Sequence, residues 1–274
     1  MKKRILAVFL ALGMLACLLS ACGGATNQTS KSSDETSASS GQNSVDSEQN
    51  HANEITVGIA QDLDDSLDPY QMTAAGTREV MFNVFEGLVK PDSDGNFVDA
   101  VASEHSVSDD QLTYTFTLRD GVVFHNGAEC TVDDVLYSFE TCAATTVNSA
   151  VAEALSAIVD TKTEGNQISF TLSAPNSDFI SYVSNVYIVP KDYAEQATQP
   201  VGTGPFKYVS RSVQENVVLE KNADYYGEQA KLDKVTYKIF EDNTAMMTAL
   251  NAGGLDLVAH LTSDQVNTLT NGYD

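Results

Sequence analysis

A polar tract near the N-terminus decides where a folded domain can begin. Residues 23–53 are almost all small or polar, with Val45 as the one large aliphatic residue and no Phe, Tyr or Trp. Such a segment cannot bury enough apolar surface to offset the conformational entropy lost on ordering. We therefore expect a flexible linker over residues 22–53, with a span of roughly 30 Å, and a folded part that begins at Glu54.

The residues before this linker have the parts of an export signal. Met1-Lys2-Lys3-Arg4 is basic, and the apolar run from Ile5 to Leu19 is shorter than a membrane-spanning helix requires. Leu19-Ser20-Ala21-Cys22 then resembles the lipobox of bacterial lipoproteins. The resemblance implies a signal peptide over residues 1–21 and acylation of Cys22, with palmitate as a lipid, on the outer face of the cell membrane. An uncleaved anchor and an ordinary signal peptide are the alternatives.

The charge of the chain limits its partners. With 38 acidic residues against 15 Lys and Arg, the formal net charge is −23 at pH 7. A chain of this charge is repelled by nucleic acid and by anionic lipid headgroups. We expect no nucleic-acid partner. The sequence also lacks the Gly-x-Ser-x-Gly and His-Glu-x-x-His motifs, and we expect neither an enzyme nor a bound cofactor.

Two cysteines lie beyond the signal and the lipid-acceptor position. Cys130 and Cys142 flank a predicted helix over Val132–Thr141, which would separate them by about 18 Å at 1.5 Å per residue. A disulfide requires Cα atoms within about 7 Å. We therefore predict that the two cysteines are unpaired packing residues.

Both strands and helices are predicted after Glu54. Strict alternation over Thr113–Leu118 indicates a strand with one apolar face. Thr77 is predicted to cap one helix, and Thr131 with Asp134 to open another. The other predicted strands are 54–60, 122–124, 167–172, 187–189, 204–209, 217–220, 235–240 and 256–260, and the other helices are 150–159, 244–251 and 264–269. This order lacks regular strand–helix–strand alternation and indicates a mixed α/β or α+β fold.

Four segments, in order along the chain, carry a resemblance to a known family. They are Leu67-Asp68-Pro69 with Val84–Val89; Tyr114–Gly121 with Phe124–Gly127 and Asp133–Ser138; Pro200–Phe206; and Asn222–Gly227. Together they resemble the family 5 extracellular solute-binding proteins of ABC importers, which bind oligopeptides, dipeptides or nickel. The chain departs from the family pattern at His105, at Cys130-Thr131 and at Gly253–Asp256.

The resemblance implies the α/β fold of type II periplasmic-binding proteins. Residues 54–85 and 187–274 would form lobe one, and residues 86–186 a smaller inserted subdomain. Family members have two lobes that close on a ligand. The resemblance covers the first lobe, so we expect the second lobe to be missing from this chain.

The implied function is that of a lipid-anchored, monomeric substrate-binding component. It would capture short peptides and deliver them to the permease subunits of an ABC importer. Ligand contact is implied for the loop after Leu67-Asp68-Pro69, at Met72, Thr73, Ala74, Ala75 and Gly76. A hydroxyl at Thr73 and a glycine at position 76 suit close approach by an extended peptide. The alternative is an ordinary polar loop in front of a helix capped by Thr77.

Other functions of the same fold stay open. A peptide sensor without transport fits the sequence equally, and a nickel-chelate or oligosaccharide binder belongs to the same family. The absence of Trp counts against a sugar ligand, because sugar binders stack aromatic rings on the ligand.

The remaining polar clusters do not have the spacing of a metal or phosphate site. Asp62, Asp64, Asp65 and Asp68 lack the pattern of an EF-hand and are predicted to form a solvated turn. No metal spacing relates the histidines at positions 105, 125 and 260. Gly202–Lys207 lacks P-loop spacing and is predicted to be a turn into a strand. We expect no metal site.

Overall fold

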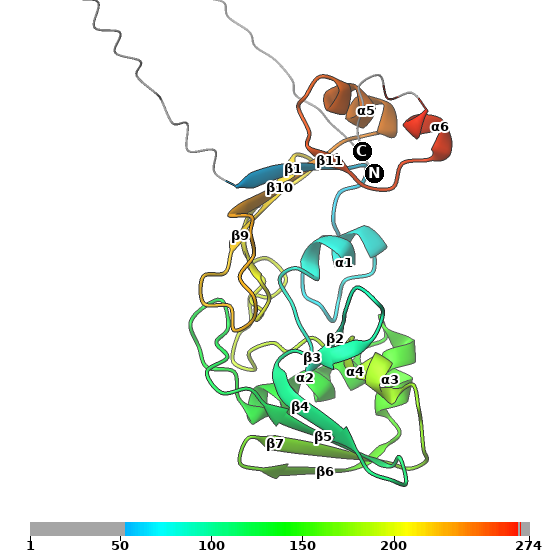
Figure 1. Cartoon of the computed structure of the whole chain (residues 1–274), viewed down its shortest axis with the longest axis vertical. Helices are drawn as coiled ribbons and strands as arrows, with labels where there is room; N and C mark the ends of the chain where they lie inside the picture. The colour runs from blue at the N-terminus through cyan, green and yellow to red at the C-terminus, as the bar shows by residue number, and fades with distance from the viewer. Residues whose placement is uncertain (1–52, 268, 270–274) are drawn as a thin grey trace, which may run out of the picture. The chain divides into compact units, whose positions relative to one another are not determined.

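The computed structural model describes residues 53–267 and 269 (Figure 1). The predicted signal peptide, Cys22 and almost all of the predicted linker lie outside the described residues. The described strands are β1 (Glu54–Ile59), β2 (Val89–Pro91), β3 (Phe97–Asp99), β4 (Ala102–Val107), β5 (Thr113–Leu118), β6 (Ile158–Glu164), β7 (Gln167–Leu172), β8 (Phe206–Ser212), β9 (Asn216–Lys221), β10 (Lys234–Ile239) and β11 (Leu257–Val258). The described helices are α1 (Ala75–Met81), α2 (Val132–Ala144), α3 (Ser149–Leu155), α4 (Phe179–Val183), α5 (Asn243–Asn251) and α6 (Ser263–Val266). None of these described helices has the length and apolar character needed to cross a bilayer.

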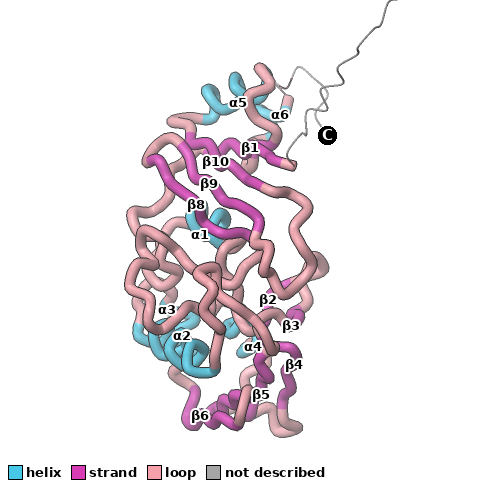
Figure 2. The backbone as a smooth tube through the Cα atoms, turned by 90° about the vertical axis from the view of Figure 1, so that its left-hand side faces the viewer, coloured by secondary structure: helices cyan, strands magenta, loops and turns pink. Residues whose placement is uncertain are grey.

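A mixed five-stranded sheet brings together the beginning and the end of the described chain. Its strand order is β11-β1-β10-β9-β8, with β1 parallel to both of its neighbours and the β8–β9–β10 ladder antiparallel. Helices α1 and α5 lie on opposite sides of this sheet (Figures 1 and 2). A Cβ atom on Gly58 of β1 would lie 2.7 Å from Leu255 Cδ1 and 2.9 Å from Met246 Cγ of α5, so a larger residue there would displace these side chains.

A second sheet, with order β4-β5-β7-β6, is antiparallel throughout. The predicted alternation over Thr113–Leu118 is confirmed, since Tyr114, Phe116 and Leu118 are buried while the threonines between them are only partly buried. Helices cover the apolar face of this sheet. Phe139 of α2 stacks on Phe170 of β7 with ring centroids 4.3 Å apart.

The second sheet's helix α2 confirms two predictions from the sequence. Thr131 and Asp134 form the predicted capping box, in which each residue's side chain is hydrogen bonded to the backbone of the other. Cys130 and Cys142 are both free and buried, as predicted from the length of the helix between them. Burial raises the pKa of the Cys142 thiol to about 11, which keeps it protonated at neutral pH.

Several predicted boundaries are wrong. Thr77 does not cap α1, because it is buried inside the helix and its hydroxyl accepts a hydrogen bond from the amide of Asp64. The helix predicted over 150–159 ends at Leu155, since Ile158 already begins β6. Residues 187–189 form no strand in the described chain. They are held by single contacts, such as the bond from Ile188 N to Glu86 O.

The two sheets draw on different parts of the sequence. The five-stranded sheet uses residues 54–59 and 206–258, and the antiparallel sheet uses residues 102–172. One hydrophobic cluster nevertheless includes Val57 from the first sheet and Phe116 from the second. The division into lobe one and an inserted subdomain stays a prediction.

A direct contact between backbones joins β8 to the segment that follows α1. Gly204 N donates to Val84 O at 2.9 Å, and Phe206 N donates to Asn83 O at 3.1 Å. A Cβ atom on Gly202 would lie 2.2 Å from Val84 O, and one on Gly204 would lie 2.5 Å from Asn83 O. Only glycine at positions 202 and 204 allows the two backbones to meet. The predicted turn into a strand is confirmed, and β8 begins at Phe206.

His125 fastens a third segment to this contact. Its amide donates to Gly202 O at 2.9 Å, and its ring lies between Gly202 N, 3.3 Å from Nδ1, and Gly204 O, 3.0 Å from Nε2. The ring therefore accepts at Nδ1 and donates at Nε2, which is the arrangement of a neutral imidazole. Desolvation lowers the pKa of His125 to about 4, and the nearby Lys207 also disfavours the charged ring.

Replacing Gly202 by alanine tests the backbone contact. We expect Gly202→Ala to lower the free energy of unfolding by about 3 kcal/mol, because a methyl group at this position overlaps a backbone oxygen that cannot move away alone. Gly76→Ala is the matched control, since a Cβ atom there meets nothing within 4 Å. Urea denaturation measures both. Equal stability of the two variants would show that the contact is not tight.

The ring of His125 makes stability depend on pH. Its pKa is about 4 in the folded chain, against an ordinary value of 6.5, so the unfolded chain binds the proton more readily between these values. The contribution of neutral His125 is present above pH 6.5 and is lost as the pH falls to about 4. The loss is at most about 3 kcal/mol.

Urea denaturation of the wild type and of His125→Gln, from about pH 7 to about pH 4, isolates this contribution to the free energy of unfolding. Glutamine can accept and donate as the neutral ring does, but it does not titrate. We expect the difference between the two proteins to change over this range. Parallel pH curves would contradict the assignment.

Candidate ligand-binding site

Three parallel strands end at one edge of the five-stranded sheet. Because β1 runs parallel to both β10 and β11, the residues that follow Ile59, Ile239 and Val258 come together at this edge. In open α/β sheets, ligands bind in the crevice beyond the carboxyl ends of the parallel strands, because loops diverge there. This edge is therefore the part of the described chain in which a ligand site is expected.

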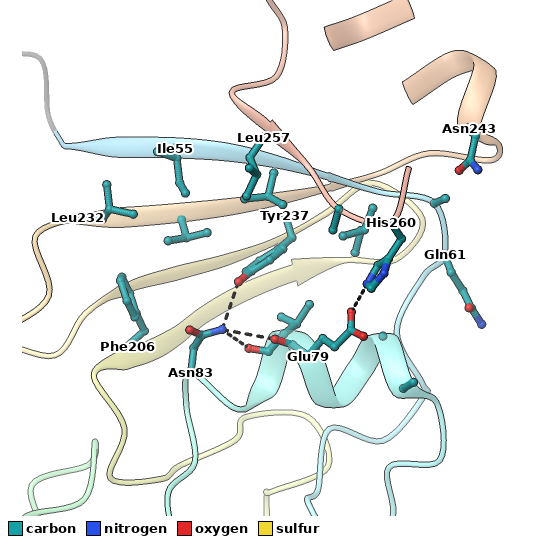
Figure 3. A pocket seen from close by; sticks show the side chains of 18 residues that line it. Ile55, Gln61, Glu79, Asn83, Phe206, Leu232, Tyr237, Asn243, Leu257 and His260 are labelled. Carbon is teal, nitrogen blue, oxygen red and sulfur yellow. Dashed lines mark hydrogen bonds and ion pairs between the residues drawn. The ribbon is translucent and has the colours of Figure 1, made fainter. Parts of the chain in front are cut away.

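A cavity of about 640 Å³ lies between this sheet and α1, and its lining reaches Gln61 and His260 at the carboxyl edge (Figure 3). Its volume lies in the usual range for a small-molecule site. The sheet contributes apolar side chains and the Tyr237 phenol, while α1, Asn83 and the residues after the strands contribute further polar groups. The lining residues are Ile55, Val57, Ile59, Ala60, Gln61, Ala75, Gly76, Glu79, Val80, Asn83, Phe206, Leu232, Val235, Tyr237, Asn243, Leu257, Ala259 and His260.

Two polar groups of the lining, Asn83 and Tyr237, are hydrogen bonded to each other. Asn83 Nδ2 donates to Val80 O at 2.9 Å and lies 3.2 Å from the Tyr237 hydroxyl (Figure 3). Burial raises the pKa of the Tyr237 phenol, so the group is neutral at physiological pH. Around Tyr237 the cavity therefore offers apolar surface and a neutral hydroxyl.

At the rim, α1 meets the residues that follow β11. Glu79 Oε2 and His260 Nε2 lie 2.7 Å apart, and both side chains are exposed. His260 has a positive φ of 61°, so its backbone turns sharply after the strand. An exposed pair of this kind contributes little stability. The pair lies where α1 and the turn after β11 approach each other (Figure 3).

Two of the residues predicted to contact ligand line this cavity: Ala75 and Gly76. A Cβ atom on Gly76 would meet nothing within 4 Å. Both belong to the first turn of α1. A ligand at the rim could therefore approach the backbone of this turn closely.

Thr73 and Ala74 lie just before this turn, and their amides are occupied. Asp64 Oδ2 accepts from Thr73 N at 2.7 Å and from Ala74 N at 2.8 Å. The Thr73 hydroxyl bonds to the other oxygen of the same carboxylate at 3.0 Å. These two backbone amides are thus bonded within the protein and are not free to bind a ligand.

Met72 occupies a different environment from the rest of the predicted segment. Its side chain is 1% exposed and belongs to the hydrophobic core. Its amide donates to Asp68 O, and its carbonyl accepts from Arg78. The structure therefore places Met72 beneath the loop as support. Ligand contact by the segment as a whole stays a prediction.

The acidic cluster is not the solvated turn expected from the sequence. Asp64 binds the two amides described above, and Asp62 forms an ion pair with Arg211 at 2.9 Å. Backbone amides that need acceptors explain why these carboxylates are bonded within the protein. Among the described residues, no three His, Cys, Asp or Glu side chains gather in a way that could hold a metal ion.

Sequence reasoning missed Gln61, Asn243 and His260. Each follows or borders the end of a parallel strand, but their positions along the chain give no sign that they are neighbours. The pairing of β1 with β10 and β11 had to be known first. No local motif carries that information.

Comparison with known proteins places this geometry in a family. Residues 96–274 match the family model described as bacterial extracellular solute-binding proteins, family 5 Middle. The chain is 28% identical, over 64% of its length, to the nickel-binding periplasmic protein of Escherichia coli K12, of which it covers 35%. It is also 28% identical, over 74% of its length, to the glutathione-binding protein GsiB of Pectobacterium atrosepticum, of which it covers 41%.

A solved structure supports the same fold. The ABC transporter-associated periplasmic binding protein DppA of Helicobacter pylori, in complex with the peptide STSA, matches with a TM-score of 0.72 and 28% identity. The match covers 79% of this chain and 48% of that protein. The chain thus spans less than half the length of these three relatives. With this mixed sheet architecture and a family match over more than half of its residues, the chain belongs to the family 5 bacterial extracellular solute-binding proteins and has their type II periplasmic-binding-protein fold.

Proposed function

We propose that this chain is part of a lipid-anchored substrate-binding component of an ABC importer that captures short peptides outside the cell membrane. It would act as a monomer and deliver its ligand to the permease subunits. The observation that carries the proposal is the position of Ala75 and Gly76 on a cavity at the carboxyl edge of the parallel strands. The relative from H. pylori, which shares the fold, was solved with a tetrapeptide.

The described residues would supply one wall of the binding site. We propose that residues 54–85 and 187–274 form lobe one and that residues 86–186 form a subdomain inserted into it. The separate origin of the two sheets supports this division. A ligand held only by this wall would lack contacts on its opposite side, so its affinity for this chain would be lower than for a closed two-lobed site.

Nickel is the second candidate ligand, because one of the similar proteins is a nickel-binding protein. The cavity described above favours the peptide, since the lining around Tyr237 offers apolar surface and a neutral hydroxyl, and no three metal-ligating side chains gather among the described residues. A sensor that binds peptide without transport would use the same site. Loss of peptide uptake on deletion of the gene favours transport, and unchanged uptake favours sensing.

A bulky side chain at Gly76 should obstruct the rim without disturbing the core. We expect Gly76→Phe to weaken binding of the tetrapeptide Ser-Thr-Ser-Ala at least about tenfold, because the ring would project into the open space at this position. Isothermal titration calorimetry on the 274-residue chain measures the affinity.

Ala143→Phe, at an exposed position on α2 far along the sequence, is the control for adding an aromatic ring. Equal weakening by both variants would assign the effect to something other than the cavity. A wild-type chain that binds Ni²⁺ but not the tetrapeptide would reverse the choice of ligand.

Lipidation at Cys22 gives a second, independent test. We expect wild-type protein expressed in bacteria to incorporate labelled palmitate and to sediment with membranes, because acyl chains partition into the bilayer. Cys22→Ser should abolish both, while Cys17→Ser, within the signal, should leave both intact. Incorporation of palmitate into Cys22→Ser would contradict the assigned acceptor.

A further inference from the structure

One acidic side chain controls the shape of the segment that precedes the cavity. Asp64 lies in the loop between β1 and α1, and its carboxylate turns back toward the end of that loop. It accepts the amides of Thr73 and Ala74 and the Thr73 hydroxyl, at 2.7, 2.8 and 3.0 Å. The amide of Asp64 in turn donates to Thr77 Oγ1 at 2.8 Å. One residue thus fixes three points along Thr73–Thr77.

Asp64 is itself held from the sheet. Arg211 of β8 donates through Nη1 to Asp64 O at 2.6 Å and through Nη2 to Leu63 O at 2.8 Å. The same guanidinium pairs with Asp62, and its side chain is only 9% exposed. A buried, multiply bonded arginine has little freedom to move. The position of Asp64 is therefore tied to the five-stranded sheet.

The contacts form a continuous connection from the sheet to the rim of the cavity. Arg211 holds the stretch Asp62–Asp64, and Asp64 holds Thr73 and Ala74, which lead directly into Ala75 and Gly76. Without Asp64, the two amides would lose their acceptor within the protein, and the bonds that hold the loop in this arrangement would be gone.

We propose that Asp64, anchored by Arg211, is a positioning residue that fixes Thr73–Gly76 in the conformation that meets a ligand. The ligand role of the segment rests on the proposed function. The connection from Arg211 through Asp64 to Thr73 and Ala74 does not depend on it. Asp64 does not line the cavity and acts through the backbone of its neighbours.

Amide hydrogen exchange tests the positioning without any ligand. In the full chain, we expect Asp64→Ala to speed exchange at Thr73 and Ala74 at least roughly tenfold, because both amides lose a charged acceptor. Asp65→Ala is the matched control: it removes the same charge from the next residue, which is exposed. Asp64→Asn keeps an oxygen that can accept both amides and should retain most of the protection.

Unchanged exchange at Thr73 and Ala74 in Asp64→Ala would overturn the proposal. So would equal acceleration in Asp65→Ala. If Asp64→Ala fails to fold, the wild-type chain gives the answer by pH titration followed by NMR. Burial alone would raise the pKa of Asp64, but the bonds from Ala74 and Thr73 outweigh it and lower the pKa below the usual value. The backbone amide resonances of Thr73 and Ala74 should shift together at pH values below the usual pKa of an aspartate. If they do not shift there, the proposal is overturned.

Binding of Ser-Thr-Ser-Ala separates this inference from the proposed function. Faster exchange together with at least roughly tenfold weaker binding in Asp64→Ala supports the positioning of a ligand-contact segment. Faster exchange with unaltered binding would overturn the ligand role of Asp64 while leaving the proposed function in place. Failure of the wild-type chain to bind would count against the proposed function, and the exchange result would still decide whether Asp64 fixes the segment.

Discussion

The contact between the backbones of Gly202–Gly204 and Asn83–Val84 is the constraint on which the arrangement of the site depends. It brings the start of β8 against the residues that leave α1, at a separation that excludes any side chain. His125 adds the hairpin turn of a third segment to the same point. Three stretches that are far apart in sequence are thereby fixed together through main-chain atoms, which cannot adjust as side chains can.

The position of the cavity follows from this contact. Because Asn83 lies two residues after the end of α1, fixing its carbonyl to β8 holds the helix beneath the sheet. The remaining space between helix and sheet is lined by apolar side chains of the sheet and reaches the residues that follow the parallel strands. Arg211 and Asp64 then determine the conformation of the loop that enters α1. The sheet thus sets both the place of the helix and the shape of its entry.

The local parts of this fold could be predicted from the sequence. Alternation in Thr113–Leu118 predicts a half-buried strand, and Thr131 with Asp134 predicts the start of a helix. Both predictions succeed because each pattern depends only on residues that are neighbours in the sequence. The prediction that Thr77 caps α1 was wrong for a physical reason. A threonine near a helix start usually caps it, but here a distant amide, that of Asp64, occupies the hydroxyl. The candidate site depends even more on contacts between residues distant in sequence, which a local pattern does not predict. Within the predicted segment Met72–Gly76, only Ala75 and Gly76 line the cavity. The polar residues at the rim come from strand ends that parallel pairing unites, and pairing between distant strands leaves no local pattern.

The central claim is that a ligand binds at the carboxyl edge of the parallel strands, beside the first turn of α1. Mapping amide chemical shifts of the full chain during titration with Ser-Thr-Ser-Ala tests it directly. The account predicts that the largest shifts occur at Gln61, Ala75, Gly76 and Asn243, which line the cavity near this edge. Shifts confined to the separate cavity beside Arg119 and Asp133, or spread evenly over both sheets, would contradict it.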